Sequence, residues 1–440
     1  MEVVIASSSD DAGIGCWDLR TGAEKLRYKT CASPPHGLVS VGGRFLASSQ
    51  LREPSASSGS VLFWSWSKPQ PEVKSFPAEP IKPLAANSLG TYIVGGGSSG
   101  NIYLWEVATG RLLKKWKAHL RGVTCLVFSE DDSLLISGSE DGCIRVWSLF
   151  RIFDDVQSQQ ASHLYEHSIT EHSLPVTDIV TGYGGCNAIL VSASKDRTCK
   201  VWSLSEGRLL RNIVFPSEID VIALDPGEHV FYAGSRDGNI YIVALHAESK
   251  PSKVFGMHII GLLSDHSKPV TCLAYSKEGN SLLSGSEDGM VKVWDLKTQN
   301  IIRMFRHAKG PVNNILIVKP QSSPNLSKRH GSLLPPPLEK YANSSDKETD
   351  NKAVIALQAT ISSTPEPFYY SSQLINDHIK ELQQQGSAAA EIDVERLKLD
   401  CKRSMQMLQQ WKKMYDNLHE FCVDELLDGH QVPGSEGNSA

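Results

Sequence analysis

The sequence predicts an all-β protein, a seven-bladed β-propeller, followed by a C-terminal α-helical coiled-coil tail. Two stretches carry this prediction, LLISGSEDGCIRVWSL at 134–149 and LLSGSEDGMVKVWDL at 282–296. Each stretch has the pattern of a strand, a tight Ser-Glu-Asp-Gly turn and a second strand that ends in Trp. In each, a His lies 22 residues before the Asp of the turn. Self-similarity with a period of about 40 residues is the sequence signature of propeller blades.

Seven blades follow from the spacing of the strand that ends in Trp or its replacement. The intervals between these strand ends are 47, 41, 42, 55, 41 and 51 residues. β-Branched and apolar runs such as VTCLVF at 123–128 and VTCLAY at 270–275 suit innermost strands, which are buried on both faces. Asp-Gly pairs supply hairpin turns because Gly accepts a positive φ. The seven strand-ending residues are Trp17, Trp64, Trp105, Trp147, Trp202, Val243 and Trp294.

The first and last pieces of the propeller are expected to complete one blade together. Residues 2–29 supply only three strands, so the innermost strand of the Trp17 blade is missing. The run PVNNILIV at 311–318 has an innermost-strand pattern, and no blade follows it. We therefore expect 312–318 to pair with the N-terminal strand, which hides two strand edges and makes 1–318 one closed propeller.

Beyond residue 318 the composition changes. Residues 319–370 are rich in Pro, Ser and charge and are predicted to form a low-complexity linker. Residues 371–428 are predicted to be helical because apolar residues recur at heptad spacing, and 429–440 are predicted to be disordered. The heptad seam consists of Val394, Leu397, Cys401, Leu408, Trp411, Tyr415, Leu418 and Cys422.

This seam predicts a homodimer formed through a coiled coil. Two other interpretations stay open: the apolar stripe docks on the side of the propeller, or it fills a groove of a foreign protein.

Composition argues against several classes of protein. A net charge of -5 gives no global reason to bind nucleic acid. No apolar run approaches the roughly 20 residues of a membrane span, and the N-terminus lacks the basic and apolar regions of a signal peptide. Nine scattered cysteines without CxxC pairs indicate buried free thiols in a reducing compartment.

One set of residue types recurs in the complete repeats, and we interpret it as structural framework. A buried indole N–H needs an acceptor, a Ser hydroxyl supplies it, and His links that hydroxyl to the turn Asp. A catalytic triad is needed once, whereas this set repeats around the ring, so we expect no enzymatic activity, no cofactor and no metal. The predicted network comprises His119, Ser137, Asp141, Trp147, His172, Ser192, Asp196, Trp202, His266, Ser284, Asp288 and Trp294, with His307, Asp11 and Trp17 in the first blade.

The set decays elsewhere in the ring. Val243 replaces Trp, and SSG at 57–59 and at 98–100 stands where a turn Asp is expected. Either drift or a surface reshaped for a partner accounts for the loss, and we favour drift.

A short motif suggests an alternative function. The run CWDLR at 16–20 matches the Trp-Asp-x-Arg pattern associated with substrate receptors of cullin ring ubiquitin ligases. In that hypothesis Arg20 is the discriminating residue. The simpler interpretation is that Trp-Asp is how such a strand ends.

Over roughly residues 1–318 the chain resembles the WD-repeat family. Several stretches that a generic blade does not require look more closely like the WD-repeat protein eighteen family, and in particular like a plant member of it. These are MEVVIASSSDDAGIGCWDLRTG at 1–22, FWSWSKPQPEVKS at 63–75, GNIYLWEVATGRLLKKW at 100–116, RVWSLFRIFDD at 145–155 and YGGCNAILVSASKDRTCKVWSL at 183–204.

The resemblance implies a non-enzymatic scaffold subunit of a Rix-type complex, acting in late 60S ribosomal subunit assembly and in removal of the second internal transcribed spacer from precursor rRNA. It implies as partners a helical-repeat protein of the proline-, glutamate- and leucine-rich family, a third helical-repeat subunit, a midasin-type AAA ATPase and the pre-60S particle. It also implies dimerisation through the C-terminal helix and residence in the nucleus, in nucleolus and nucleoplasm.

Overall fold

The computed structural model describes residues 2–50, 59–153, 164–245, 258–276, 281–307, 310–319 and 335–341. By its internal contacts the chain divides into two units, 1–349 and 350–440, and all described residues belong to the first. The predicted helical tail and the whole dimer seam therefore lie outside the described residues, as does most of the predicted linker.

Within these residues the chain forms seven antiparallel sheets of four strands, and the predicted seven-bladed propeller is confirmed. Blade one comprises β28 (Val312–Val318), β1 (Val3–Ser8), β2 (Ile14–Asp18) and β3 (Glu24–Tyr28). Blade two comprises β4 (Leu38–Val41), β5 (Phe45–Gln50), β6 (Ser60–Ser65) and β7 (Val73–Ser75). Blade three comprises β8 (Ile81–Ala86), β9 (Tyr92–Gly97), β10 (Asn101–Glu106) and β11 (Leu112–Lys117).

Blade four comprises β12 (Val123–Phe128), β13 (Leu134–Ser139), β14 (Ile144–Ser148) and β15 (Tyr165–Ile169). Blade five comprises β16 (Val176–Thr181), β17 (Ile189–Ser194), β18 (Thr198–Ser203) and β19 (Arg208–Val214). Blade six comprises β20 (Ile219–Leu224), β21 (Val230–Ser235), β22 (Asn239–Ala244) and β23 (Ile259–Ser264). Blade seven comprises β24 (Val270–Ser276), β25 (Ser281–Ser286), β26 (Met290–Asp295) and β27 (Ile301–Arg306). The short α1 (Leu149–Phe153) follows β14, and a 3-10 turn, η1 (Gly185–Asn187), precedes β17.

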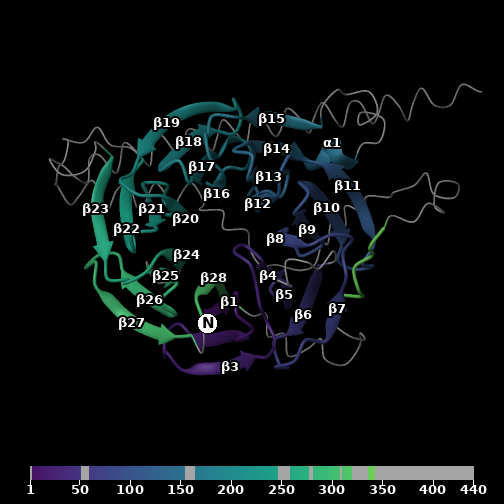
Figure 1. Ribbon diagram of the computed structural model, residues 1–440, viewed down its shortest axis with the longest axis horizontal. Coiled ribbons are helices and arrows are strands. Elements are labelled where there is room, and N and C mark those ends of the chain that lie inside the picture. The colour runs from purple at the N-terminus through teal and green to yellow at the C-terminus, as the bar shows by residue number, and fades with distance from the viewer. Residues whose placement is uncertain are drawn as a thin grey trace, which may run out of the picture. The chain divides into compact units, whose positions relative to one another are not determined.

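The blades surround a common centre, with β4, β8, β12, β16, β20, β24 and β28 innermost (Figure 1). The last strand closes the ring, because β28 pairs antiparallel with β1 in a register that places Ile315 opposite Ala6. On the far side of β1 lies β2, so β1 has a partner on both edges. The expected strand exchange between the ends of the propeller is therefore present in the structure.

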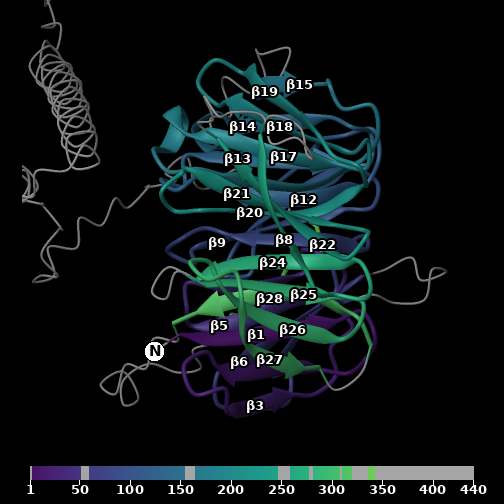
Figure 2. The same ribbon diagram turned by 90° about the vertical axis from the view of Figure 1, so that its left-hand side faces the viewer.

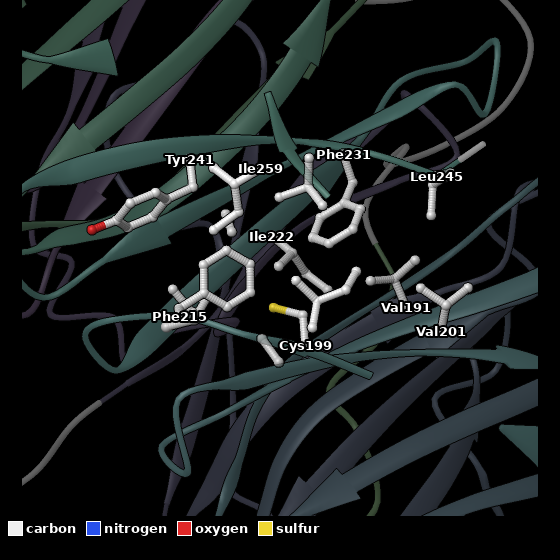
Figure 3. Close-up of a cluster of buried hydrophobic side chains, with 14 residues drawn as sticks. Val191, Cys199, Val201, Phe215, Ile222, Phe231, Tyr241, Leu245 and Ile259 are labelled. Carbon is white, nitrogen blue, oxygen red and sulfur yellow. The ribbon is translucent and has the colours of Figure 1, made fainter. Parts of the chain in front are cut away.

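The hydrophobic core consists of clusters between neighbouring blades. Figure 3 shows the one between blades five and six, where Phe215, Phe231 and Tyr241 pack around Cys199. All seven cysteines within the described residues are free thiols, and burial raises the pKa of Cys199 well above its ordinary value. Buried thiols such as that of Cys199 contribute packing and are poor nucleophiles.

Candidate functional site

Blade five contains the predicted His–Ser–Asp–Trp network in full. Trp202 Nε1 donates to Ser192 Oγ at 2.9 Å, and His172 Nε2 lies 2.8 Å from the same oxygen. His172 Nδ1 lies 2.9 Å from Asp196 Oδ2. With the imidazole protonated on Nδ1, the Ser hydroxyl donates to Nε2 and Nδ1–H donates to the carboxylate. Every group then has its partner.

Blade seven repeats this arrangement, and blade four repeats it except for the hydrogen bond between His and Asp. In blade seven the distances are 2.8 Å from Trp294 Nε1 to Ser284 Oγ, 2.8 Å from His266 Nε2 to that oxygen and 2.9 Å from His266 Nδ1 to Asp288 Oδ2. In blade four, Trp147 Nε1 and His119 Nε2 lie 2.9 and 2.7 Å from Ser137 Oγ, and His119 Nδ1 lies 3.5 Å from Asp141 Oδ1.

Burial dominates the ionisation of these histidines. It lowers the pKa of His119, His172 and His266 below the ordinary value of 6.5, and the adjacent carboxylates oppose this only in part. For the partner Asp288, burial favours the neutral acid, but the hydrogen bonds from His266 and from the Met290 amide outweigh it and lower its pKa. The networks therefore combine a neutral imidazole with an ionised carboxylate.

These shifts predict that acidification destabilises the propeller. The pKa of each histidine is lower in the folded than in the unfolded chain, so the unfolded chain binds more protons once the pH falls below about 6.5. The aspartates act in the same direction near pH 4, since their pKa values are also lowered on folding. Between pH 6 and 5 the free energy of unfolding should fall with a slope of up to about 4 kcal/mol per pH unit for three protons. Urea unfolding followed by tryptophan fluorescence measures this slope. His266→Gln should reduce the slope, and an unchanged slope would contradict the burial of neutral His266.

The geometry gives these networks a structural role. In each of them the hydroxyl already accepts from an indole and contacts an imidazole, and the Ser and His side chains are buried. No cluster of three or more His, Cys, Asp or Glu side chains suited to a metal occurs among the described residues.

Blade six keeps the turn residue Asp237 but has apolar residues at the Ser, His and Trp positions of the network. Ala233 occupies the Ser position, two residues beyond the pairing partner of Val243. Phe215 occupies the His position, because its N–H donates to a turn carbonyl of the preceding blade, as the His119 N–H does. All three side chains are buried in one hydrophobic cluster (Figure 3). The loss in blade six is therefore a concerted change that leaves no buried indole N–H without an acceptor.

Blade one departs from the prediction. Asp11 is exposed, and the neighbouring Asp10 makes the turn contact, since its N–H donates to Ser8 Oγ at 3.1 Å. In blades four, five and seven the turn Asp makes the same contact with the preceding Ser. Ala6 occupies the Ser position, so Trp17 instead stacks on Phe305, with ring centroids 5.5 Å apart. His307 is buried, and this turn is one residue longer than those of blades four, five and seven; the grouping of His307 with Asp11 stays a prediction.

Blade three differs in another way. Gly95 occupies the Ser position, and the buried Trp105 donates its indole N–H to the carbonyl of Glu339 at 2.9 Å. Residues 335–341, which we call the strap, thus lie against this blade although they fall within the predicted low-complexity linker. Leu338 of the strap is buried in the cluster between blades two and three. The prediction of a linker over the whole of 319–370 is therefore wrong at the strap.

A connection between blades crosses the centre of the ring. His36, between blades one and two, has its carbonyl bonded to the Leu84 N–H of blade three. Its Nε2 lies 3.1 Å from the Thr177 carbonyl and 3.7 Å from Asp178 Oδ1, both in blade five. One residue therefore contacts innermost strands on different sides of the ring, and the centre is occupied by the chain itself at this level.

Exposed apolar side chains gather on the outer strands of three successive blades. Figure 1 places β19, β23 and β27 next to one another along the rim, and Figure 2 views the propeller from this side. The side chains alternate along the strands, so these positions point outward. We call them the outer apolar surface: Leu210 (44% exposed), Val214 (66%), Ile260 (55%), Ile302 (54%) and Met304 (59%). An exposed apolar surface is a candidate site for protein contacts.

The Trp-Asp-x-Arg motif has a local structural explanation. Asp18 accepts from the backbone N–H groups of Arg20 and Thr21 at 2.9 and 3.0 Å and lies 3.0 Å from Lys25 Nζ. The Arg20 side chain is exposed, and its carbonyl accepts from Arg303. Asp18 is thus required by the turn that ends the strand.

Within the described part of the chain there is also no helix with the length and apolar character needed to cross a bilayer.

Comparison with known families matches three of the blades. The family described as WD domain, G-beta repeat matches residues 110–148, 164–203 and 257–295. These segments end with the Trp strands of blades four, five and seven. They are the blades in which the indole, the Ser hydroxyl and the His are bonded together.

Whole-chain comparisons find relatives of similar length. Protein ROOT INITIATION DEFECTIVE 3 of Arabidopsis thaliana is 56% identical over 97% of this chain and 98% of that protein. WD repeat-containing protein 18 of Homo sapiens is 34% identical over 72% of this chain and 73% of that protein. Pre-rRNA-processing protein IPI3 of Yarrowia lipolytica is 29% identical over 69% and 72%. Among solved structures, the computationally designed Ika8 protein is 25% identical, covers 70% of this chain and 86% of its own, and has a TM-score of 0.50.

Proposed function

Because this chain belongs to the WD-repeat protein 18 family, we propose that it is a non-enzymatic scaffold protein of ribosome biogenesis. Its site of action is the nucleus, in nucleolus and nucleoplasm. There it serves as a subunit of a Rix-type complex in late 60S assembly and in processing of the second internal transcribed spacer. The observation that carries this proposal is the relationship to a protein whose name states a role in pre-rRNA processing.

The geometry supports a scaffold more than an enzyme. The recurring His, Ser and Asp side chains hold the blades together, and the chain itself occupies the centre of the ring at His36. What remains for partners is the rim and the loops. The outer apolar surface offers exposed apolar side chains on three successive blades that a partner protein can bury.

We assign partners to this scaffold as follows. The helical-repeat subunits of the Rix-type complex, one of them from the proline-, glutamate- and leucine-rich family, bind the propeller, and the assembly meets the pre-60S particle and a midasin-type AAA ATPase. The seam at 394–422 joins two copies as a coiled coil. Two copies raise the apparent affinity for a large particle without new contacts, provided that both reach it.

Depletion and complementation test the function together with the outer apolar surface. Loss of the protein should raise the level of rRNA precursors that contain the second internal transcribed spacer, and the wild-type chain should restore processing. Ile302→Asp with Met304→Asp should fail to restore it, since two carboxylates replace exposed apolar contacts on β27. Precursor levels are measured by hybridisation.

The matched control is Ser168→Asp, which adds a carboxylate at an exposed position of the outer strand of blade four without removing an apolar side chain. The control should process rRNA like the wild type. Unchanged precursor levels on depletion would contradict the proposed function. Restoration by the β27 double variant would contradict only the role of this surface.

A further inference from the structure

Hydrogen bonds of its backbone and the Glu339 carboxylate hold the strap on the propeller. Leu338 N–H donates to Ser75 Oγ at 2.8 Å, and Glu339 N–H donates to the Gly110 carbonyl at 2.8 Å. The Glu339 carbonyl accepts from Trp105, and its carboxylate accepts from the Leu112 N–H at 3.3 Å. Both edges of the strap backbone are thus bonded, to blades two and three.

Burial along the strap follows a period of three. Pro335 and Leu338 are buried, whereas Pro336 and Pro337 between them are exposed. A polyproline II segment has three residues per turn, so its positions i and i+3 lie on one face. A polyproline II segment has low conformational entropy before it binds, so an aromatic groove that binds it loses less free energy in ordering it.

The groove is shaped for this backbone. Gly110 adopts a φ of +72°, and a Cβ atom there would lie 2.6 Å from the Pro337 carbonyl oxygen. Gly95 leaves the Trp105 indole without the Ser acceptor that it has in blades four, five and seven, and the strap carbonyl takes that place. The decay of the network in blade three therefore coincides with a new acceptor, which favours a reshaped surface over drift at this blade.

We propose that the groove formed by Ser75, Trp105, Gly110 and Leu112 is a recognition site for a Pro-x-x-Leu-Glu segment, and that its ligand is the chain's own strap bound in cis. The site holds residues 338 and 339 at blades two and three, although β28 ends in blade one. Binding in cis is favoured because the tether of residues 319–334 keeps the strap at a high effective concentration.

The test uses the full-length chain and hydrogen exchange. Leu338→Ser should release the strap and raise the exchange rate of the 338, 339 and 112 amides at least tenfold, with the circular dichroism of the propeller unchanged. Pro336→Ser, at an exposed position of the same strap, is the matched control and should leave these rates as in the wild type. Unchanged rates in the Leu338→Ser chain would overturn the proposal.

A labelled peptide of residues 330–345 separates recognition from mere packing. It should bind the full-length Leu338→Ser chain and not the wild-type chain, whose groove is filled. Adding Ser75→Ala, which removes the acceptor of the Leu338 N–H, should weaken that binding at least tenfold. The assignment of a recognition site would be overturned if the peptide failed to bind the Leu338→Ser chain. It would also be overturned if the peptide bound the Leu338→Ser chain equally well with and without Ser75→Ala.

Discussion

Replacing Ser192 with Ala lowers the free energy of unfolding by about 2 to 4 kcal/mol, because one hydroxyl serves two buried partners. Its loss leaves the Trp202 indole N–H without an acceptor and removes the donor to His172 Nε2. All three side chains are buried, so water cannot replace the hydroxyl without opening the blade. Urea denaturation monitored by tryptophan fluorescence gives the difference.

Blade six supplies the matched control. Ala233 occupies the equivalent position in blade six, beside Val243 and Phe215. Neither of these side chains has an N–H group that needs an acceptor. The reverse change, Ala233→Ser, should therefore also destabilise, by about 1 to 3 kcal/mol, since it buries a hydroxyl among apolar groups. If Ser192→Ala were neutral while Ala233→Ser destabilised, the network would contribute nothing beyond filling space.

A chain that ends at residue 311 fails to fold into a cooperative propeller, whereas a chain that ends at residue 341 folds. The shorter chain lacks β28, which supplies the buried Val312 and Ile315 to the cluster with blade seven and pairs along β1. Burial of each of these side chains contributes about 1.5–3 kcal/mol, and the exposed edge of β1 adds to the loss. The total is comparable with the roughly 5–15 kcal/mol that stabilises a typical domain.

Thermal melting and size-exclusion chromatography distinguish the two chains. The longer chain should melt in one transition and elute as a single species, and the shorter one should melt broadly and aggregate through its open edge. A cooperative transition of equal midpoint in both chains would contradict closure of the ring by β28.

The sequence alone was sufficient for the ring because its signals are local and repeated. The Trp spacing predicts seven blades, and the lone strand pattern at 312–318 predicts its partner at the other end of the chain. The polar networks in blades four, five and seven follow from the recurrence of His, Ser, Asp and Trp at near-constant spacing. In each case a short stretch of the sequence contains the residues that form the turn or that bond the buried donor.

Features that depend on distant neighbours were not predicted. The strap has a single aliphatic residue, Leu338, and it is buried in a cluster with Trp105, more than 230 residues away in the sequence. His36 contacts blade five only because the ring brings that blade opposite its own. Local patterns in the sequence do not encode these distances.

Affinity purification of the tagged full-length chain, followed by mass spectrometry and light scattering, tests the scaffold assignment most directly. We predict a dimer that brings down helical-repeat subunits and pre-60S proteins, and a monomer for a chain that ends at residue 386. A monomeric full-length chain that instead brings down a cullin adaptor, and loses it on Arg20→Ala, would contradict the account.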